Sequence, residues 1–240
     1  MKDPYLYDNC NVLRNKLNIK DSAELDAAER DLTSIALTTV GDIKGNFDYD
    51  HYKRIHEHIF GNVYDWAGKE RSIPIAKAEK VLDGMSVEYT VPRDIKKEAT
   101  ACINKLNATD WKTLDINERA DRYAENIAAL WKTHPFREGN TRTAITFACE
   151  YANAHGFSMN KQIFAKNSAY TRNALVMASL GEYADTSYIS RIFKDSMTLS
   201  EEKSIQPKKQ NPKTKINRYD SSYTGINVSE PISGSDYEKS

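Results

Sequence analysis

The sequence predicts a mostly helical, all-α domain with a small β-hairpin flap and a disordered C-terminal tail. Apolar residues recur at three- and four-residue steps through most of residues 1–198, which is the spacing of amphipathic helices. A short stretch at about 72–92 instead contains two extended runs separated by the turn signal Asp83-Gly84. Over residues 199–240 this apolar periodicity is lost, and a disordered tail or linker is expected there.

The first three helices have recognisable boundaries. Asp21 offers a cap for a helix whose apolar positions lie within 25–36, and residues 46–50 offer caps for the next helix. A strongly amphipathic pattern covers 116–131. This helix should end near Thr133, because a residue that precedes a proline is pushed out of the helical region.

The remaining helices follow a loop. A helix should begin near Asn140 or Thr141, and Gly156 is a natural stop for it. Two further helices are expected to fill 161–180 and 186–197. The whole of residues 1–198 is therefore predicted to form one helical domain.

The segment at about 72–92 is expected to form a β-hairpin, or at least a hairpin-like flap. Its two extended runs carry alternating apolar residues, which favours strands. Pro74 and Pro92 lack an N–H group, so they should limit the number of bonds that these strands make.

Composition excludes several classes of protein. Lys+Arg and Asp+Glu both number 34, so the chain as a whole is not an electrostatic footprint for nucleic acid, and direct nucleic-acid binding is not expected. No apolar run approaches the roughly 20 residues that a membrane-spanning helix needs, and the N-terminus has no apolar signal core. Basic residues within 203–218 leave contact with a membrane or nucleic acid as an alternative, although a solvated tail is favoured.

The cysteines indicate a reducing compartment. Cys10, Cys102 and Cys149 are widely spaced, odd in number and without a CxxC pair. Reduced thiols of this kind are typical of the cytosol, so a cytoplasmic location is expected.

Residues 134–142 (His-Pro-Phe-Arg-Glu-Gly-Asn-Thr-Arg) carry the chemistry of the sequence. A helix ends before this loop and another begins within it, so unpaired N–H groups and the positive end of a helix dipole face the same place. These groups favour an anion. Gly139 lets the backbone approach a phosphate closely. The loop is therefore predicted to bind phosphate.

The side chains of the loop fit a transfer reaction on that phosphate. Asn140 adds a side-chain donor and a helix cap, and Arg142 lies in the first helical turn, where it can neutralise a phosphate oxygen. Glu138 is a hard oxygen ligand suited to Mg²⁺. His134 titrates near neutral pH and can act as a general base. Phe136 should anchor the loop in the core.

Each of these residues has a simpler interpretation when taken alone. A histidine before a proline at a helix end is usually structural, and a loop arginine or glutamate is usually solvated. Their joint occurrence around Gly-Asn at a helix start favours the catalytic interpretation.

The loop resembles the signature of the Fic family, His-Pro-Phe-x-(Asp/Glu)-Gly-Asn-(Gly/Lys)-Arg. Residues 64–71 (Tyr-Asp-Trp-Ala-Gly-Lys-Glu-Arg) look like the run that precedes the flap in this family. Residues 5–7 (Tyr-Leu-Tyr) and 12–17 resemble one branch, which includes bacterial toxins and relatives secreted into host cells. The resemblance covers roughly residues 5–197, and its signature is long and specific.

The resemblance implies a Fic fold and a protein AMP transferase (AMPylator). His134 would accept the proton of a target Tyr, Thr or Ser hydroxyl as that hydroxyl attacks the α-phosphate of ATP. Glu138 would hold Mg²⁺ on the phosphates, and Arg142 would neutralise the leaving pyrophosphate. The other nucleotide-binding residues that it implies are Arg137, Gly139, Asn140 and Thr141.

The resemblance also assigns a role to the flap, which would clamp the target by strand addition. Ile73 and Ile75 are the expected docking residues of the extended run. The candidates for target choice at the tip are Lys77, Glu79 and Lys80, and solvated flap charges are an equally good interpretation of them.

Two positions depart from the family pattern. Thr141 stands where Gly or Lys is usual, and Ile145 stands where many AMP-transferring members have a second arginine. Loss of one charge-assisted phosphate contact costs about 1.5–3 kcal/mol. Transfer of a different phosphate-containing moiety is therefore an alternative, and a non-catalytic, target-binding Fic module is another.

Regulation and target are also inferred from the resemblance. Fic proteins are commonly inhibited by a helix with the motif (Ser/Thr)-x-x-x-Glu-(Gly/Asn), and the nearest match here, from Thr198 to Glu202, is followed by Lys203. A small antitoxin-like partner that supplies the glutamate is therefore expected. Small GTPases or other host proteins suit the secreted branch, in a host-cell cytosol, whereas bacterial proteins such as topoisomerases suit the toxin branch.

One further motif is set aside. His56-Glu57-His58 resembles a metal-binding pair, but histidines two residues apart on a helix face away from each other. A position on the helix surface is predicted for both histidines.

Overall fold

The computed structural model describes residues 3–205, which form α-helices joined by loops and short 3₁₀ turns. Short 3₁₀ turns occur at Val40–Asp42, Lys80–Leu82, Pro92–Asp94 and Gly181–Tyr183. The α-helices are α1 (Ser22–Leu37), α2 (Tyr49–Phe60), α3 (Ile95–Asn107), α4 (Ile116–Thr133), α5 (Asn140–Ala154), α6 (Lys161–Lys166), α7 (Ser168–Met177) and α8 (Ser187–Ile205).

Aspartate side chains start three of these helices. The carboxylate of Asp21 accepts a hydrogen bond from the backbone N–H of Glu24 at 2.8 Å, and Asp48 accepts from His51 at 2.7 Å. Asp115 accepts from two N–H groups at the start of α4. Each contact satisfies amide groups that have no partner inside the helix.

The predicted ends of α4 and α5 are confirmed. Helix α4 ends at Thr133, and α5 begins at Asn140 and ends at Ala154, with Gly156 at a φ of 83° just beyond it. Downstream, the expected helix over 161–180 is divided into α6 and α7.

The predicted start of the tail is too early. Helix α8 continues to Ile205, past the boundary expected at residue 199. The prediction of disorder over 206–240 lies outside the described residues.

The predicted β-hairpin at 72–92 is wrong. Within residues 3–205 there is no β-strand, and the sole bridge is an isolated one between Leu6 and Leu13. The segment is an extended loop whose tip is closed by a bond from the N–H of Glu79 to the carbonyl of Met85, 3.0 Å long.

The side chain of Arg71 explains why strands do not form there. Its guanidinium donates to the carbonyls of Ile73 (2.7 Å) and Thr90, one on each limb of the loop, and to the carbonyl of His134 (2.8 Å). These carbonyls are acceptors that a strand ladder would need. A buried side chain therefore replaces the backbone bonds that the sequence pattern suggested.

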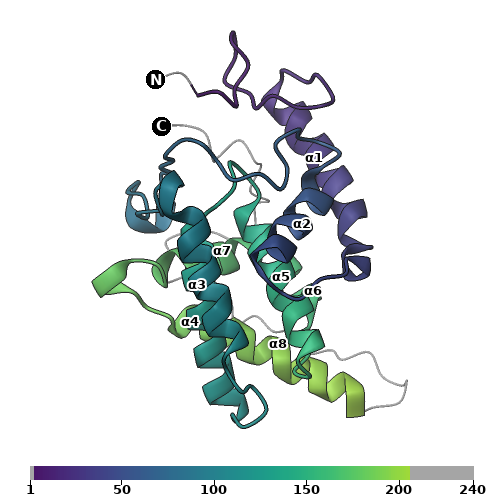
Figure 1. Cartoon of the computed structure of the whole chain (residues 1–240), viewed down its shortest axis with the longest axis vertical. Helices are drawn as coiled ribbons and strands as arrows, with labels where there is room; N and C mark the ends of the chain where they lie inside the picture. The colour runs from purple at the N-terminus through teal and green to yellow at the C-terminus, as the bar shows by residue number, and fades with distance from the viewer. Residues whose placement is uncertain (1–2, 206–240) are drawn as a thin grey trace.

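Helix α4 lies at the centre of the bundle and packs against α3, α5 and α8, while α2 packs against α1 and α5 (Figure 1). The fully buried side chains of Tyr52, Trp131, Phe136 and Phe147 fill the space between these helices. The predicted anchoring of Phe136 in the core is thereby confirmed. This packing holds the loop between α4 and α5 against α2, α1 and α7.

None of the helices in the described part of the chain has both the length and the apolar character that crossing a bilayer requires.

Candidate active site

The loop at 134–142 has a backbone that two residues make possible. His134, at the end of α4, has a φ of 44°, and Gly139, at the start of α5, has a φ of 80°. A Cβ atom at Gly139 would overlap the ring of Phe60 on α2. Only glycine therefore fits both the left-handed backbone and the close approach of α2.

Asn140 closes the loop with its side-chain amide. Its Oδ1 accepts from the N–H of Phe136 at 3.0 Å, and its Nδ2 donates to the carbonyl of the same residue at 2.8 Å. The predicted helix cap is wrong, because the capping position is Gly139 and no side chain bonds the first turn. The amide of Asn140 instead holds the loop in shape.

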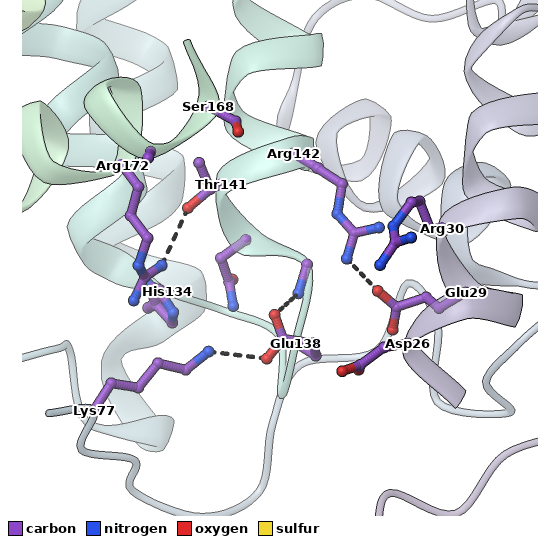
Figure 2. A pocket seen from close by; sticks show the side chains of 13 residues that line it. Asp26, Glu29, Arg30, Lys77, His134, Glu138, Thr141, Arg142, Ser168 and Arg172 are labelled. Carbon is purple, nitrogen blue, oxygen red and sulfur yellow. Dashed lines mark hydrogen bonds and ion pairs between the residues drawn. The ribbon is translucent and has the colours of Figure 1, made fainter. Parts of the chain in front are cut away.

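The loop opens into a cavity of about 290 Å³. Figure 2 shows His134 and Lys77 on one side of it, Arg142 and Glu29 on the other, and Glu138 between them. Seven of the predicted site residues line it, namely Lys77, His134, Glu138, Gly139, Asn140, Thr141 and Arg142. Helices α1 and α7 contribute the rest, namely Asp26, Glu29, Arg30, Ser168, Ala169 and Arg172.

His134 meets the requirements of a general base. Its ring is buried, with its centroid 3.9 Å from that of Tyr89 and 5.1 Å from that of Trp131. Among the described residues neither ring nitrogen has a hydrogen-bond partner. Burial lowers the pKa of His134 well below 6.5, and the positive charges of Lys77 and Arg172 lower it further. The imidazole is therefore neutral and able to accept a proton at neutral pH.

Glu138 is an ionised carboxylate that faces the cavity. Its Oε1 accepts from the N–H of Gly139 at 2.9 Å, and its Oε2 accepts from the ammonium of Lys77 at 2.9 Å. Burial raises the pKa of Glu138, but Lys77, the Gly139 N–H and Arg142 outweigh it, and the pKa lies well below its usual range. The described residues hold no cluster of three His, Cys, Asp or Glu side chains. One ionised carboxylate fits Mg²⁺ carried in with nucleotide phosphates better than a metal held by protein ligands alone.

Arg142 reaches the cavity from the first turn of α5 and is held there by α1. Its guanidinium forms an ion pair with Glu29 and donates to Thr33 Oγ1 at 3.0 Å. It also lies over the ring of Phe60, 4.6 Å from the centroid. The arginine is thus positioned before any anion binds.

Of the two other residues expected to bind nucleotide, Thr141 lines the cavity and Arg137 does not. Arg137 does not line the cavity, since its guanidinium is paired with Asp3 at 2.9 Å. Thr141 does line it, and its Oγ1 accepts from Trp131 Nε1 at 3.0 Å and from Arg172 at 3.4 Å.

The predicted docking residues of the flap differ in their burial. Ile73 and Ile75 are half-buried and Lys80 is exposed. Lys77, in contrast, is buried, and its ammonium enters the catalytic cavity (Figure 2). The interpretation of Lys77 as a solvated flap charge is therefore wrong.

The predicted surface position of His56 is wrong. It is fully buried, stacked on Phe136 with 3.7 Å between ring centroids. Its Nδ1 accepts from the N–H of Gly68 at 2.8 Å, so its Nε2 carries the proton and donates to the carbonyl of Glu138 at 3.0 Å. Burial lowers the pKa of His56 to about 3. A signal existed, because His56 lies four residues from both Tyr52 and Phe60 on the apolar stripe of α2.

Arg172 and Glu29 were missed because nothing local marks them. Arg172, on α7, is buried and paired with Glu79 of the flap at 2.6 Å, and Tyr89 donates to the same carboxylate at 3.1 Å. These partners are distant in sequence, and only the packing of α1, α7 and the flap around the loop brings them together.

A second, apolar hollow of about 330 Å³ adjoins the first and shares Thr141, Arg142 and Ser168 with it. Ile145, the residue that departs from the family pattern, lies in the wall of this hollow and does not line the first cavity. Its remaining wall comes from Leu37, Val40, Thr146, Cys149, Lys161, Gln162, Phe164, Ala165 and Thr171.

Sequence comparison finds relatives that are named as adenylyltransferases. Protein adenylyltransferase VbhT of Bartonella schoenbuchensis is 35% identical over 161 residues, which are 66% of this chain and 32% of VbhT. This chain therefore spans about a third of the length of VbhT. Probable protein adenylyltransferase y4lH of Sinorhizobium fredii is 33% identical over 166 residues, which are 67% of this chain and 81% of y4lH.

Solved structures share the fold. The N-terminal Fic domain of a putative cell filamentation protein of Bartonella quintana, a VirB-translocated Bep effector protein with bound ADP, matches with a TM-score of 0.68 at 25% identity. The match covers 80% of this chain and 93% of that chain. A sequence model described as the Fic/DOC family matches residues 46–152, the part that contains α2 to α5 and the catalytic loop. Because 81% of y4lH is matched at 33% identity and the Fic/DOC model matches residues 46–152, the chain belongs to the Fic/DOC family.

Proposed function

We propose that this chain is a protein adenylyltransferase that moves AMP from ATP to a hydroxyl group of a target protein. The observation that carries the proposal is the meeting of neutral His134, ionised Glu138 and Arg142 in one cavity at the start of α5. A base, a hard anionic ligand and a phosphate-binding helix terminus are the components of a nucleotidyl transfer site. The names of VbhT and y4lH support the same activity.

The residues divide the reaction between them. The target hydroxyl oxygen attacks the α-phosphorus of ATP, and its proton passes to a ring nitrogen of His134. The bond from the α-phosphorus to the oxygen bridging the β-phosphate breaks, and pyrophosphate leaves. Arg142 and the N–H groups at the start of α5 neutralise the charge that develops on the phosphates. Binding of ADP to the related Bartonella quintana domain supports the assignment of the cavity to an adenine nucleotide.

Mg²⁺ belongs to this proposal as the partner of the phosphates. Glu138 is the residue that would hold it, because its carboxylate is ionised and lies in the cavity wall. When bound, the ion neutralises phosphate charge and orients the leaving group. His56 supports this residue from behind, since its Nε2–H fixes the backbone carbonyl of Glu138.

The target is a second protein that docks on the segment 71–92. Ile73 and Ile75 offer half-buried apolar contacts beside the cavity, and Lys80 is exposed at the tip. The Bartonella quintana relative is described as a VirB-translocated effector, which favours a host protein, and the resemblance of residues 5–7 and 12–17 to the branch that includes toxins leaves a bacterial protein as the alternative. The corresponding compartments are a host cytosol and the bacterial cytoplasm.

Inhibition is assigned to a small antitoxin-like partner that supplies a glutamate on a helix. The apolar hollow beside Arg142 supports this assignment, because it would receive the apolar face of such a helix next to the phosphate-binding residues. Because Ile145 offers no charge, the supplied glutamate would lack the arginine that usually pairs with it.

The proposal is tested with α-labelled ATP, Mg²⁺ and cell lysate, with His134→Ala as the control. Label should pass to a protein only with the wild-type chain. Absence of transferred label, or equal label with the variant, would count against the proposal. Labelled GTP, CTP and UTP, each also tested with Ile145→Arg, determine whether another nucleotide is the preferred donor.

A further inference from the structure

Lys77 stands out because it joins the flap to the residue assigned to the metal. It belongs to the segment 71–92, yet only 6% of its side chain is exposed, and its ammonium lies 2.9 Å from Glu138 Oε2. The other carboxylate oxygen accepts from the N–H of Gly139. Both oxygens of Glu138 are thus engaged by the protein itself.

The backbone on either side of Lys77 is held in place. The N–H of Lys77 donates to Ser86 Oγ at 3.0 Å, which ties it to the opposite limb of the loop. Two residues further on, Glu79 is buried and paired with Arg172 of α7. Between these two anchors, the long side chain of Lys77 is the part that can change position.

A dication and an ammonium group compete for one carboxylate, because the two positive charges repel each other at that distance. Binding of Mg²⁺ to Glu138 would therefore weaken the hold of Glu138 on the Lys77 ammonium and favour its transfer to another anion. Lys77 lines the same cavity as His134 and Arg142, where the donor phosphates bind in the proposed function. A phosphate oxygen is the acceptor that this chemistry offers to a buried ammonium.

We propose that Lys77 is a donor-binding residue that exchanges between Glu138 and a phosphate of the nucleotide according to whether the divalent cation is bound. Before binding, the ammonium neutralises a buried carboxylate. With the metal and nucleotide in place, the same ammonium binds phosphate. Through this one side chain, the contacts of the flap change when metal and nucleotide bind. This proposal rests on the role that the proposed function gives to Glu138.

The exchange predicts opposite effects on metal and nucleotide when the charge of Lys77 is removed. Without a competing ammonium, Lys77→Gln should bind Mn²⁺, measured by EPR of the free ion at about pH 8, more tightly than the wild type, by about tenfold or more. With Mg²⁺ saturating, the same variant should bind a non-hydrolysable ATP analogue about tenfold or more weakly in calorimetry.

Two control variants distinguish the loss of the Lys77 charge from a general effect on folding. Lys77→Arg keeps the charge and should restore most of the nucleotide affinity. Lys69→Gln removes an exposed lysine just before the segment and should change neither affinity. A Lys77→Gln variant that binds Mn²⁺ no better than the wild type, or binds nucleotide equally well, overturns the proposal.

Glu138→Gln separates this proposal from the one it rests on. Loss of Mn²⁺ binding in Glu138→Gln supports the role of Glu138, and an unchanged Lys77→Gln variant then refutes the exchange alone. Retained Mn²⁺ binding in Glu138→Gln refutes the metal assignment and the exchange together. Transfer of label from ATP, with His134→Ala as control, remains an independent test of the enzyme activity.

Discussion

At the scale of the residue, the burial of His134 determines how activity should depend on pH. A base accepts a proton only while it is neutral, so activity is present above its pKa and is lost as the pH falls through it. Burial, and after it the positive charges of Lys77, Arg172 and Arg71, lower the pKa of His134 well below 6.5. The initial rate of label transfer, at limiting acceptor, should therefore stay level from about pH 8 down to pH 6.5, with the acid limb below pH 6.5.

A variant that lacks the charge of Arg172 provides the control for this pH–activity profile. Arg172→Gln removes one of the cations that lower the pKa of His134, so its acid limb should move to higher pH. A wild-type acid limb centred above pH 6.5 would show that a different group titrates.

Gly139 tests the shape of the loop. Gly139→Ala places a Cβ atom into the ring of Phe60 and strains a backbone with a φ of 80°. Strain of this kind costs about 1–3 kcal/mol, and the overlap adds to it. We expect lower stability in urea and at least tenfold slower label transfer, since a rate change of that size needs only about 1.4 kcal/mol.

Gly84→Ala is the matched control, because Gly84 has a φ of 89° but no atom within 4 Å of an added Cβ. It shares the backbone strain and lacks the overlap. If the two variants lost equal stability and equal activity, the contact with Phe60 would have no special role.

At the scale of the element, Arg71 holds the segment 71–92 against the catalytic loop. Its fork reaches the carbonyls of Ile73, Thr90 and His134, which a lysine ammonium cannot do together. Arg71→Lys should reduce the free energy of unfolding by about 2–4 kcal/mol, because buried carbonyls lose charged donors. Amide hydrogen exchange should rise in residues 71–92.

Arg93→Lys provides the comparison within the neighbouring turn, since the side chain of Arg93 is 86% exposed. It should leave both the free energy of unfolding and the exchange rates near wild type. Equal stability of Arg71→Lys and the wild type would mean that other contacts hold the segment.

At the scale of the whole molecule, α4 joins the parts of the bundle. It packs against α3, α5 and α8, and Leu130 is fully buried within it. Leu130→Ala should therefore lower the free energy of unfolding by about 2–5 kcal/mol. Urea unfolding followed by tryptophan fluorescence and by far-UV circular dichroism should shift together, as one transition.

Ile35→Ala is the surface control, because Ile35 is 68% exposed on α1. Its effect should stay within about 0.5 kcal/mol. Separate transitions for the two probes in Leu130→Ala would show that α4 does not couple the helices around it.

The fold was predictable where the information is local. Periodic apolar residues, aspartate caps and the proline after α4 identified most helices and the end of α4 at Thr133. The prediction of a β-hairpin at 72–92 failed for a physical reason. Alternating apolar residues indicate which side chains are buried, but they do not indicate which donors bond the backbone carbonyls. Arg71, at the start of the first extended run, supplies those donors from its side chain.

The sequence by itself identified residues 134–142 as the candidate site. His134, Glu138, Gly139 and Arg142 lie within one short segment, so their types and order already described a phosphate site. Helices on either side keep the four residues close together in the chain, and contacts from α1, α2 and Arg71 then hold them in place. The family follows from the same segment.

Only the tertiary structure decided what surrounds that loop. Glu138 meets Lys77 across 61 residues of chain, Arg142 meets Glu29 across 113, and Arg172 meets Glu79 across 93. Hydrophobic periodicity reports the burial of a helix face and carries no information on which charged groups meet when faces pack together. The charges that set the pKa values of His134 and Glu138 are for this reason a property of the packed bundle.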